Sequence, residues 1–542
     1  MTIAKNWIKL AEEKRREICQ QIPENWILPE DLLNKYDETT PVSVLDIPKQ
    51  FLSSSELNIT ERYSVKELLE CLATSKLSAI DVCSAFSHRA AIATQLTNCC
   101  TEIMFELGQE RARFLDEYLE ENGKPFGPLH GLPISLKDSF KVSGYDSTIG
   151  FVARINNRDE QQSDLVKQLW DLGAIFYVKT NIPQTLMTAD SENNIFGRTL
   201  NPNNLTWTAG GSTGGEGALL KMRGSLLGMG TDIAGSIRIP ALCNGVYGYK
   251  PSSNRYPNGN QEEPSRDDYV GVSAVSGPLS TDLEAIQMIT KIVFNNNPRK
   301  YDFEALNIEY REPGTLEKST LKIGVVLGDD MLPIHPPMKR VIRKAYEKLR
   351  DEYCDVQFIE KVPSYDKAWT LAWRLFQVDP GNTAFDDLLS MKEPLIKSLT
   401  LPGLETYGTG PKTLDELVEI KEQVKELKQQ WMEIFEDYDV IISPGSPGSA
   451  PPHDKYGIAP YTTMWNLVDF PAIVIPYGQV DASVDLTDDV VYDQKLDNIY
   501  AHYDPKDYDG GVCHLQISAP HMEDENLISA AILISGLLNE PL

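Results

Sequence analysis

The alternation of short apolar segments with amphipathic helical segments, from about Gly127 onward, constrains this chain most. Apolar runs typical of strands lie at 131–137, 174–178, 225–230, 321–327, 440–443 and 472–476. Helical periodicity falls between them, at 163–173, 214–223 and 413–435. Strands that alternate with helices form an α/β protein, because each helix buries its apolar face on the sheet. The sequence therefore predicts an α/β fold with a covered, largely buried sheet.

The first 120 residues have a different pattern, which predicts helices without strands. Residues 5–21 repeat apolar side chains at helical spacing, whereas 21–61 are Pro-rich and irregular. Ser64-Val-Lys-Glu67 is a capping box that predicts a helix start. Ser78-Ala-Ile-Asp81 resembles a second one, before a helix that ends near Asn98.

Charge and cysteine usage exclude several classes of protein. The 542 residues carry 51 Lys and Arg against 79 Asp and Glu, a net charge of −28. Nucleic acids and anionic membrane surfaces are therefore poor partners, because both attract basic proteins. Eight cysteines without a C-x-x-C pair predict free thiols in a reducing, cytoplasmic compartment. The N-terminus is charged on nearly every turn, and no apolar run approaches 18 residues, so neither a signal peptide nor a membrane span is expected.

Residues 481–509 form an acidic segment with nine Asp against two Lys. Such a segment is typical of a solvated excursion. Asp507-Tyr-Asp-Gly510 lacks the remaining ligands of a calcium loop, so no metal site is expected there.

A glycine-rich stretch at 209–218 carries five glycines in ten residues. Glycine supplies backbone conformations that other residues avoid and permits close backbone approach. A flexible linker is the alternative interpretation, but the segment 226–240 that follows has an apolar run ending in a tight Gly235-Ser236 turn. Backbone N–H groups from Ile233 to Ser236 would converge on one point there, as in an oxyanion hole.

Two nucleophile systems are compatible with the serines of this region. Gly210-Gly-Ser-Thr-Gly214 matches the G-x-S-x-G elbow, but that elbow follows a strand, and the turn-rich residues 201–208 precede this one. A Ser-His-Asp triad in that chain order would need His514 or His521, and a structural role suits each of them better. The elbow is therefore disfavoured.

Four segments occur in an order and at a spacing that resemble the amidase signature family, with the fungal acetamidases the most similar subgroup. They are 127–138, 178–183, 210–217 and 230–240. Residues 64–102, 466–471 and 514–517 resemble the same subgroup. The resemblance extends from about residue 60 to the end. It implies an N-terminal helical and irregular arm at 1–60 and a single amidase domain at 61–542, with its signature core at about 127–260.

The resemblance also implies a fold and a set of catalytic roles. The fold would be α/β/α, with a large, mixed, twisted sheet covered on both faces. Ser236 resembles the nucleophile, Ser212 the bridging serine held by a cis peptide, and Lys137 the base. The implied oxyanion hole consists of the backbone amides of Ile233, Ala234, Gly235 and Ser236. The implied supporting residues are Asp232, Arg238, Thr231 and Gly211.

Two residues depart from the usual family pattern. Thr213 stands where a second serine is usual, and Ala234 where glycine is frequent. A hydroxyl and a backbone N–H survive these changes, so the implied mechanism is unaffected.

Elementary chemistry agrees with these roles. A serine hydroxyl needs a neighbouring base, and a lysine serves as one only when burial or nearby positive charge keeps it neutral. Lys137 closes the apolar run 132–136, which favours a buried side chain. Taken singly, Lys137 could be a surface charge, the serines turn formers, and Asp232 with Arg238 an ordinary ion pair. The joint pattern favours catalysis.

The sequence therefore predicts an amide hydrolase that forms an acyl-enzyme and needs neither a metal nor an organic cofactor. Small aliphatic carboxamides such as acetamide are the expected substrates, with carbamates, aryl amides and fatty acyl amides as alternatives. An amidotransferase subunit acting on acyl-tRNA shares the motifs, but the charge of −28 disfavours it. A catalytically inactive relative is disfavoured by the intact Lys137, Ser212 and Ser236. A homodimer is possible.

Four apolar side chains are candidates for the substrate pocket, although core packing is the more frequent role of such residues. They are Leu186, Met187, Met464 and Trp465.

Overall fold

A computed structural model describes residues 6–264, 271–314, 316–329, 331–379, 385–400, 404–487, 496, 499–500 and 502–538. Within them, eleven strands form one sheet in the order β1-β3-β2-β6-β8-β7-β12-β13-β11-β9-β10. These strands are β1 (Cys100–Ile103), β2 (Pro133–Lys137), β3 (Ile175–Thr180), β6 (Leu227–Asp232), β7 (Tyr247–Lys250), β8 (Val275–Ser280), β9 (Lys322–Val325), β10 (Asp355–Phe358), β11 (Val440–Ser443), β12 (Ala472–Gln479) and β13 (Val512–Ser518). A separate small pair consists of β4 (Glu192–Asn193) and β5 (Gly197–Arg198).

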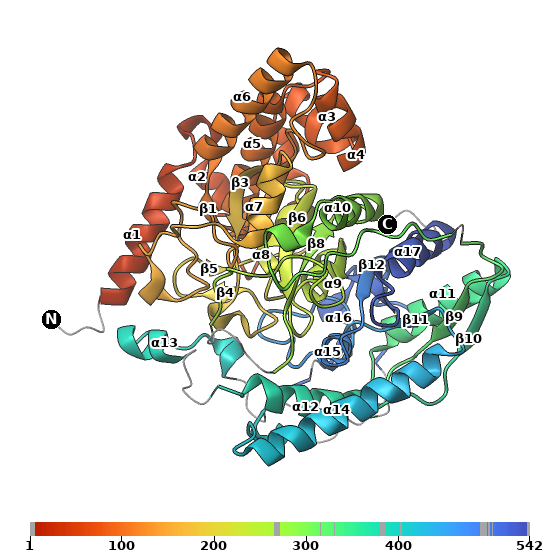
Figure 1. Ribbon diagram of the computed structural model, residues 1–542. Helices are drawn as coiled ribbons and strands as arrows, with labels where there is room; N and C mark the ends of the chain where they lie inside the picture. Colours follow the sequence, from red (N-terminus) through yellow and green to blue (C-terminus); the bar gives the residue numbers. More distant parts are fainter. Residues whose placement is uncertain are drawn as a thin grey trace.

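Helices surround this sheet, as Figure 1 shows. In chain order the α-helices are α1 (Asn6–Gln20), α2 (Glu30–Leu33), α3 (Ser54–Arg62), α4 (Val65–Ala73), α5 (Ala79–Thr97), α6 (Phe105–Asn122), α7 (Asp164–Asp171), α8 (Gly214–Lys221), α9 (Arg238–Asn244), α10 (Leu283–Asn295), α11 (Pro336–Asp351), α12 (Tyr365–Phe376), α13 (Asp386–Met391), α14 (Leu414–Phe435), α15 (Pro460–Leu467), α16 (Pro505–Tyr508) and α17 (Asp524–Leu538). The predicted α/β class is confirmed.

The sheet is mixed, and its parallel part positions the region of interest. β2 runs parallel to both β3 and β6. β6 then pairs antiparallel with β8, and antiparallel pairing continues through β7, β12, β13 and β11. The carboxyl ends of β2 and β6 therefore lie at the same edge of neighbouring strands.

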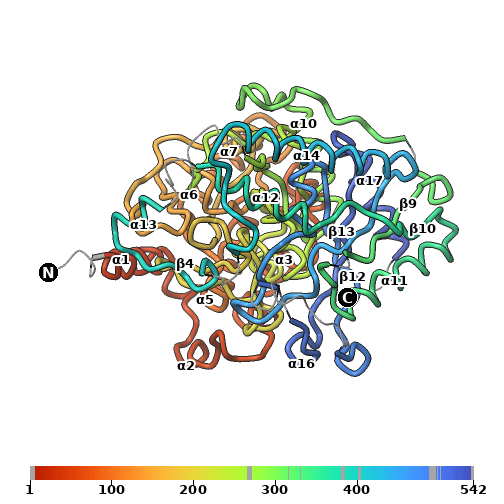
Figure 2. Tube along the Cα trace, turned by 90° about the horizontal axis from the view of Figure 1, so that it is seen from below, coloured from red at the N-terminus to blue at the C-terminus, as the bar shows by residue number. Residues whose placement is uncertain are grey.

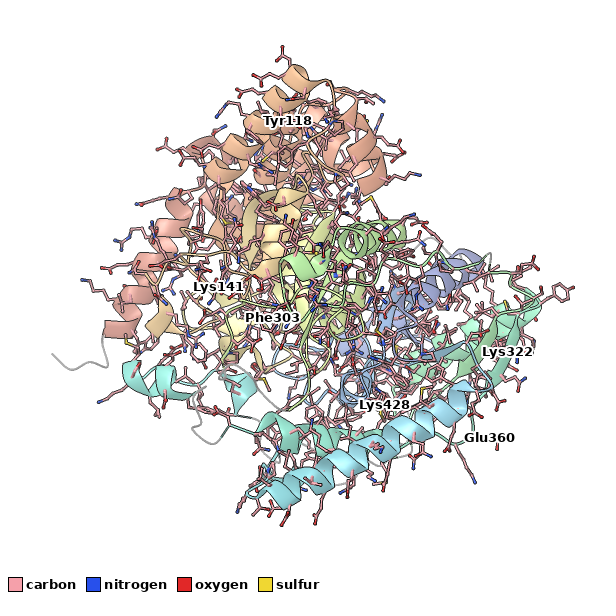
Figure 3. The ribbon with its side chains drawn as sticks, in the orientation of Figure 1. Tyr118, Lys141, Phe303, Lys322, Glu360 and Lys428 are labelled. Carbon is pink, nitrogen blue, oxygen red and sulfur yellow. The ribbon has the colours of Figure 1, made fainter. Side chains whose placement is uncertain are left out.

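Two groups of helices lie at opposite ends of the molecule. In Figure 1, α3 to α6 gather at one end, and α12 and α14 lie at the other. Figure 2, turned by 90°, again places α12 beside α14. Figure 3 labels Lys428 on α14, and its ammonium lies 5.5 Å from the ring centroid of Phe470. No helix in the described part of the chain is both long and apolar enough to cross a membrane.

Most predicted elements appear with shifted ends, and two expectations for the first 120 residues are wrong. Helices without strands are expected there, but β1 lies among the helices and pairs antiparallel with β3. The capping box at Ser64 starts α4, and Ser78 caps α5. Residues 21–61 are not wholly irregular, because α2 lies within them and α3 begins at Ser54. The Ser53 hydroxyl and the Glu56 carboxylate form a capping box at the start of α3. The Ser53–Glu56 pattern is visible in the sequence, but the prolines of residues 21–61 favour an irregular interpretation of this stretch.

The prediction of a solvated acidic segment at 481–509 is confirmed for Asp481, Asp504, Asp507 and Asp509, which are exposed, and is wrong for Asp485. Asp485 is 2 % exposed and accepts two hydrogen bonds from the Arg340 guanidinium, at 2.6 and 2.7 Å. Leu496, Ile499 and Tyr500 of the same segment are also buried, in the hydrophobic core. The local charge count missed this fixed cation, which comes from α11. Residues 488–495, 497–498 and 501 lie outside the described residues.

Candidate active site

Lys137 is the last residue of β2, and its side chain is completely buried. Its Nζ lies 2.7 Å from the Ser212 Oγ and 2.7 Å from the Thr231 Oγ1. Ser212 precedes α8, and Thr231 belongs to β6. Three elements distant in sequence therefore meet at one amine.

Burial changes the acid–base properties of this amine. Removing Lys137 from water lowers its pKa to about 7, although the carboxylates of Asp232 and Asp138 act in the opposite direction. Near neutral pH a large fraction of the side chain is therefore uncharged and can accept a proton.

The Ser212 loop approaches its neighbours closely through backbone contacts. The Gly211–Ser212 peptide is cis, as the family resemblance implied. A side chain at Gly211 would collide with the backbone of Thr188 and Ala189. The next residue, Thr213, donates its N–H to the Ser236 carbonyl at 3.2 Å. This bond ties the two serine-bearing loops together.

The second loop follows β6 and is organised by Asp232. This buried carboxylate accepts hydrogen bonds from the Gly235 N–H at 2.7 Å and the Ile237 N–H at 3.1 Å. Arg238 donates to it from Nε and Nη2, both at 3.0 Å. Burial alone would raise the pKa of Asp232, but the Arg238 guanidinium outweighs it and lowers that pKa to about 2. The loop is therefore braced by a permanent ion pair.

The Gly235 N–H already donates to the Asp232 carboxylate, so it is not available as a donor in the implied oxyanion hole. The amides of Ile233, Ala234 and Ser236 remain as candidate donors. Gly235 itself has φ +121°, and a Cβ there would collide with the Thr462 side chain, so glycine is required. At the Ala234 position, the carbonyl accepts hydrogen bonds from the Thr462 and Thr463 hydroxyls at 2.7 and 3.2 Å.

Ser236 lies two residues before the start of α9 and is 8 % exposed. Within the described residues, no hydrogen bond joins its Oγ to the Ser212 Oγ, although a bridging serine should contact both the base and the nucleophile. Catalytic hydrogen bonds are often long before substrate binds. The backbone bond from Thr213 to Ser236 holds the two serines near each other meanwhile.

Two residues that sequence reasoning left without a role fix Arg238 from the far end of the chain. Asn466 of α15 accepts from the Arg238 Nη2 at 2.6 Å and donates to the Asp232 Oδ1 at 2.8 Å. Gln516 of β13 accepts from the Arg238 Nη1 at 2.8 Å. Both lie in segments that resemble the fungal subgroup, 466–471 and 514–517, so the signal was present but carried no contact information.

The four candidate pocket residues divide into two pairs. Met464 and Trp465 are fully buried, and the Trp465 ring lies 4.7 Å from that of Trp431, between centroids. Both side chains therefore pack in the hydrophobic core, which is the more frequent role of such residues and the alternative to lining a pocket. Leu186 has φ +62° and packs against a small cluster of Ile149, Phe151 and Leu388. Met187 is 42 % exposed, so this second pair remains a candidate.

The two histidines considered for a Ser-His-Asp triad take structural positions. The His514 Nε2 accepts the Gly445 N–H at 3.0 Å, and burial lowers the pKa of His514 to about 3. The His521 Nδ1 contacts the Asp469 carbonyl at 2.7 Å. No cluster of His, Cys, Asp or Glu suited to a metal ion occurs among the described residues.

Comparison with known proteins identifies the family. The family model named Amidase matches residues 81–528. The chain belongs to the amidase family. An "Amidase" of Gibberella moniliformis is 37% identical over 98% of this chain and 99% of its own length. An "Acetamidase" of Emericella nidulans is 34% identical, with 98% of both chains covered.

Solved structures agree with this assignment. One titled "Fatty acid amide hydrolase" superposes with a TM-score of 0.91 at 30% identity, covering 99% of this amidase and 96% of that chain. A bacterial aryl acylamidase of the amidase signature family shares the fold, with a TM-score of 0.70 at 18% identity over 89% and 99% of the two chains. This amidase is thus a hydrolase of amide C–N bonds with the amidase signature fold.

Proposed function

We propose that this amidase hydrolyses small aliphatic carboxamides, acetamide among them, to a carboxylate and ammonia through Ser236, Ser212 and Lys137. The observation that carries the proposal is the 2.7 Å contact between the buried Lys137 Nζ and the Ser212 Oγ. A lysine whose pKa falls to about 7 can hold the proton that acyl transfer displaces.

The proposed reaction begins when the Ser236 Oγ attacks the amide carbonyl. The Ser236 proton passes to Ser212, whose own proton passes to Lys137. The amides of Ile233, Ala234 and Ser236 bind the resulting oxyanion, and each such donor contributes roughly 10²–10³ in rate. The C–N bond then breaks as the proton returns through Ser212 to the nitrogen, because an amide anion is too poor a leaving group. Water hydrolyses the acyl-enzyme by the same route.

The preference for small amides is supported by the relatives called acetamidase, which align along nearly the whole chain. The structural similarity to a fatty acid amide hydrolase favours long-chain amides as the second candidate. An acyl-tRNA substrate remains disfavoured by the net charge of −28.

A substrate panel tests the proposal. Purified enzyme is assayed for ammonia release from acetamide, benzamide, ethyl carbamate and oleamide, with the Ser236→Ala variant as control. We expect the highest kcat/KM for acetamide. A higher value for oleamide would transfer the assignment to fatty acyl amides. Equal turnover by wild type and Ser236→Ala would disprove the proposed nucleophile.

A cytoplasmic location is part of the same proposal. All eight cysteines are free thiols, and seven of them are buried. Free thiols persist in reducing compartments. A homodimer stays a prediction.

A further inference from the structure

Glu216 is a buried carboxyl group that the proposed mechanism does not use. It lies in the first turn of α8, four residues after Ser212, and its side chain is inaccessible to solvent. The Ser135 hydroxyl of β2 donates to its Oε1, and the Thr180 hydroxyl of β3 donates to its Oε2 at 2.8 Å. Burial raises the pKa of Glu216 to about 7, against the opposing effect of these two hydroxyls. No cation pairs with it among the described residues.

The position of Ser135 gives this contact its significance. Ser135 and Lys137 are two residues apart on β2, so their side chains point to the same face of the sheet. Helix α8 and the loop before it meet that face at two points. Ser212 contacts Lys137, and Glu216 contacts Ser135. Both contacts therefore join β2 to the segment made of α8 and the loop before it.

The strands beneath α8 pack closely around the Glu216 carboxyl group. Gly228 of β6 faces it, and a Cβ at Gly228 would collide with the carboxyl group and with the Ser135 hydroxyl. The neighbouring Gly215 donates its N–H to the Asn181 carbonyl, just past β3, at 3.0 Å. The first turn of α8 is thereby held against β2, β3 and β6 together.

We propose that Glu216 is a positioning residue, whose carboxyl group fixes α8 on β2 and thereby sets the contact between Ser212 and Lys137. This inference rests on the proposed function, since it assigns the Ser212–Lys137 pair a catalytic purpose. The competing interpretation is that Glu216 serves only the stability of the fold. The two interpretations differ in what happens to turnover by molecules that remain folded.

The experiment compares three variants on acetamide, with the folded fraction measured by circular dichroism. Glu216→Ala removes both hydroxyl contacts, and we expect kcat per folded molecule to fall about 100-fold with KM within threefold, because small displacements of reacting groups have effects of that size. Glu216→Gln keeps the shape and the hydrogen-bonding capacity, and should stay within about fivefold of wild type. Leu219→Ala, a buried apolar change on the same helix, should lower Tm and leave kcat per folded molecule unchanged.

Two results would overturn the positioning role. One is a Glu216→Ala variant whose kcat per folded molecule equals that of wild type. The other is a Glu216→Gln variant as impaired as the alanine variant. If Glu216→Ala does not fold, the double variant Ser135→Ala/Thr180→Val removes the same hydrogen bonds from the strand side, and unchanged kcat there rejects the proposal. Ser236→Ala, assayed in parallel, reports separately on the proposed function.

Discussion

Two buried carboxyl groups support the two serine-bearing loops, and they differ in their charge and in their hydrogen-bond partners. Asp232 supports the Ser236 loop as a permanent anion, paired with Arg238 and bonded to loop amides. Glu216 supports the Ser212 loop through hydroxyl groups alone, and burial raises its pKa to about 7. The Ser236 loop, which must bind a developing oxyanion, is thus supported by a charge-compensated ion pair, whereas the Ser212 loop is held by hydrogen bonds to a carboxyl group that has no cationic partner among the described residues.

The largest expected effect separates the serines of the two loops. Ser236→Ala should lower kcat by about 10⁴-fold or more, because catalytic groups of this kind act as a unit. A fluorophosphonate probe should label Ser236 and leave Ser212 unmodified, as peptide mass spectrometry would reveal. Labelling at Ser212 would instead support the G-x-S-x-G elbow and reverse the roles of the loops.

Lys137 lies between the loops, and its substitution should separate activity from stability. A lysine buried neutral binds fewer protons in the folded than in the unfolded state, so its burial penalises the fold below pH ~10.4, increasingly as pH falls, and the penalty levels off below about pH 7. Lys137→Met should therefore abolish turnover while keeping or raising Tm at neutral pH. A lower Tm for this variant would contradict the burial argument.

The same lysine sets the expected pH profile. In wild type, kcat/KM should rise with pH through about 7 and then level off, because protonated Lys137 cannot accept the serine proton. Substitutions of His130, His514 and His521 serve as controls. Loss of the acid limb in one of them would assign the base to a histidine.

Asp232→Asn should strongly weaken the interaction between residue 232 and Arg238 that supports the Ser236 loop. It leaves the Arg238 guanidinium buried without its counter-charge, which costs roughly 3–5 kcal/mol in the free energy of unfolding. Urea denaturation measures this loss. The double variant Asp232→Asn/Arg238→Met should lose less than the sum of the single variants, and strict additivity would mean that the pair is not coupled.

The smallest expected effect concerns the pH dependence of the free energy of unfolding. The contributions of the two carboxyl groups to it should have opposite signs. Since its folded-state pKa is about 2, Asp232 contributes stability that is present above pH ~3.9 and lost as pH falls toward 2. Glu216 has a raised pKa, so wild type should lose stability as pH rises from ~4.3 to about 7, by at most about 4 kcal/mol. Urea unfolding of wild type and Glu216→Gln at pH 5 and pH 8 measures this. A constant difference between the two proteins would mean that Glu216 is ionised throughout.

Much of the fold was predictable because local patterns determine it. The apolar run ending at Lys137, the helix from Gly214 and the turn at Gly235 each leave a contiguous trace in the sequence. The Ser53–Glu56 capping box was equally local and was overlooked among prolines.

The residues that sequence reasoning missed act across long separations in the chain. Gln516 contacts Arg238 over 278 residues, and Glu216 contacts Ser135 over 81. Met464 and Trp465 look like pocket residues from their type alone, and their location in the aromatic core depends on Trp431 of another helix. Such contacts depend on how distant segments meet in the fold, and no short stretch of sequence shows this.

The bond between Arg238 and Gln516 has a consequence for biosynthesis. During translation, Lys137, Ser212 and Ser236 are all made long before β13, the strand whose Gln516 contacts Arg238, leaves the ribosome. A nascent chain that carries every reacting group therefore still lacks one of the contacts that organise its nucleophile loop. Hydrolytic activity should arise late, when β13 takes its place between β12 and β11.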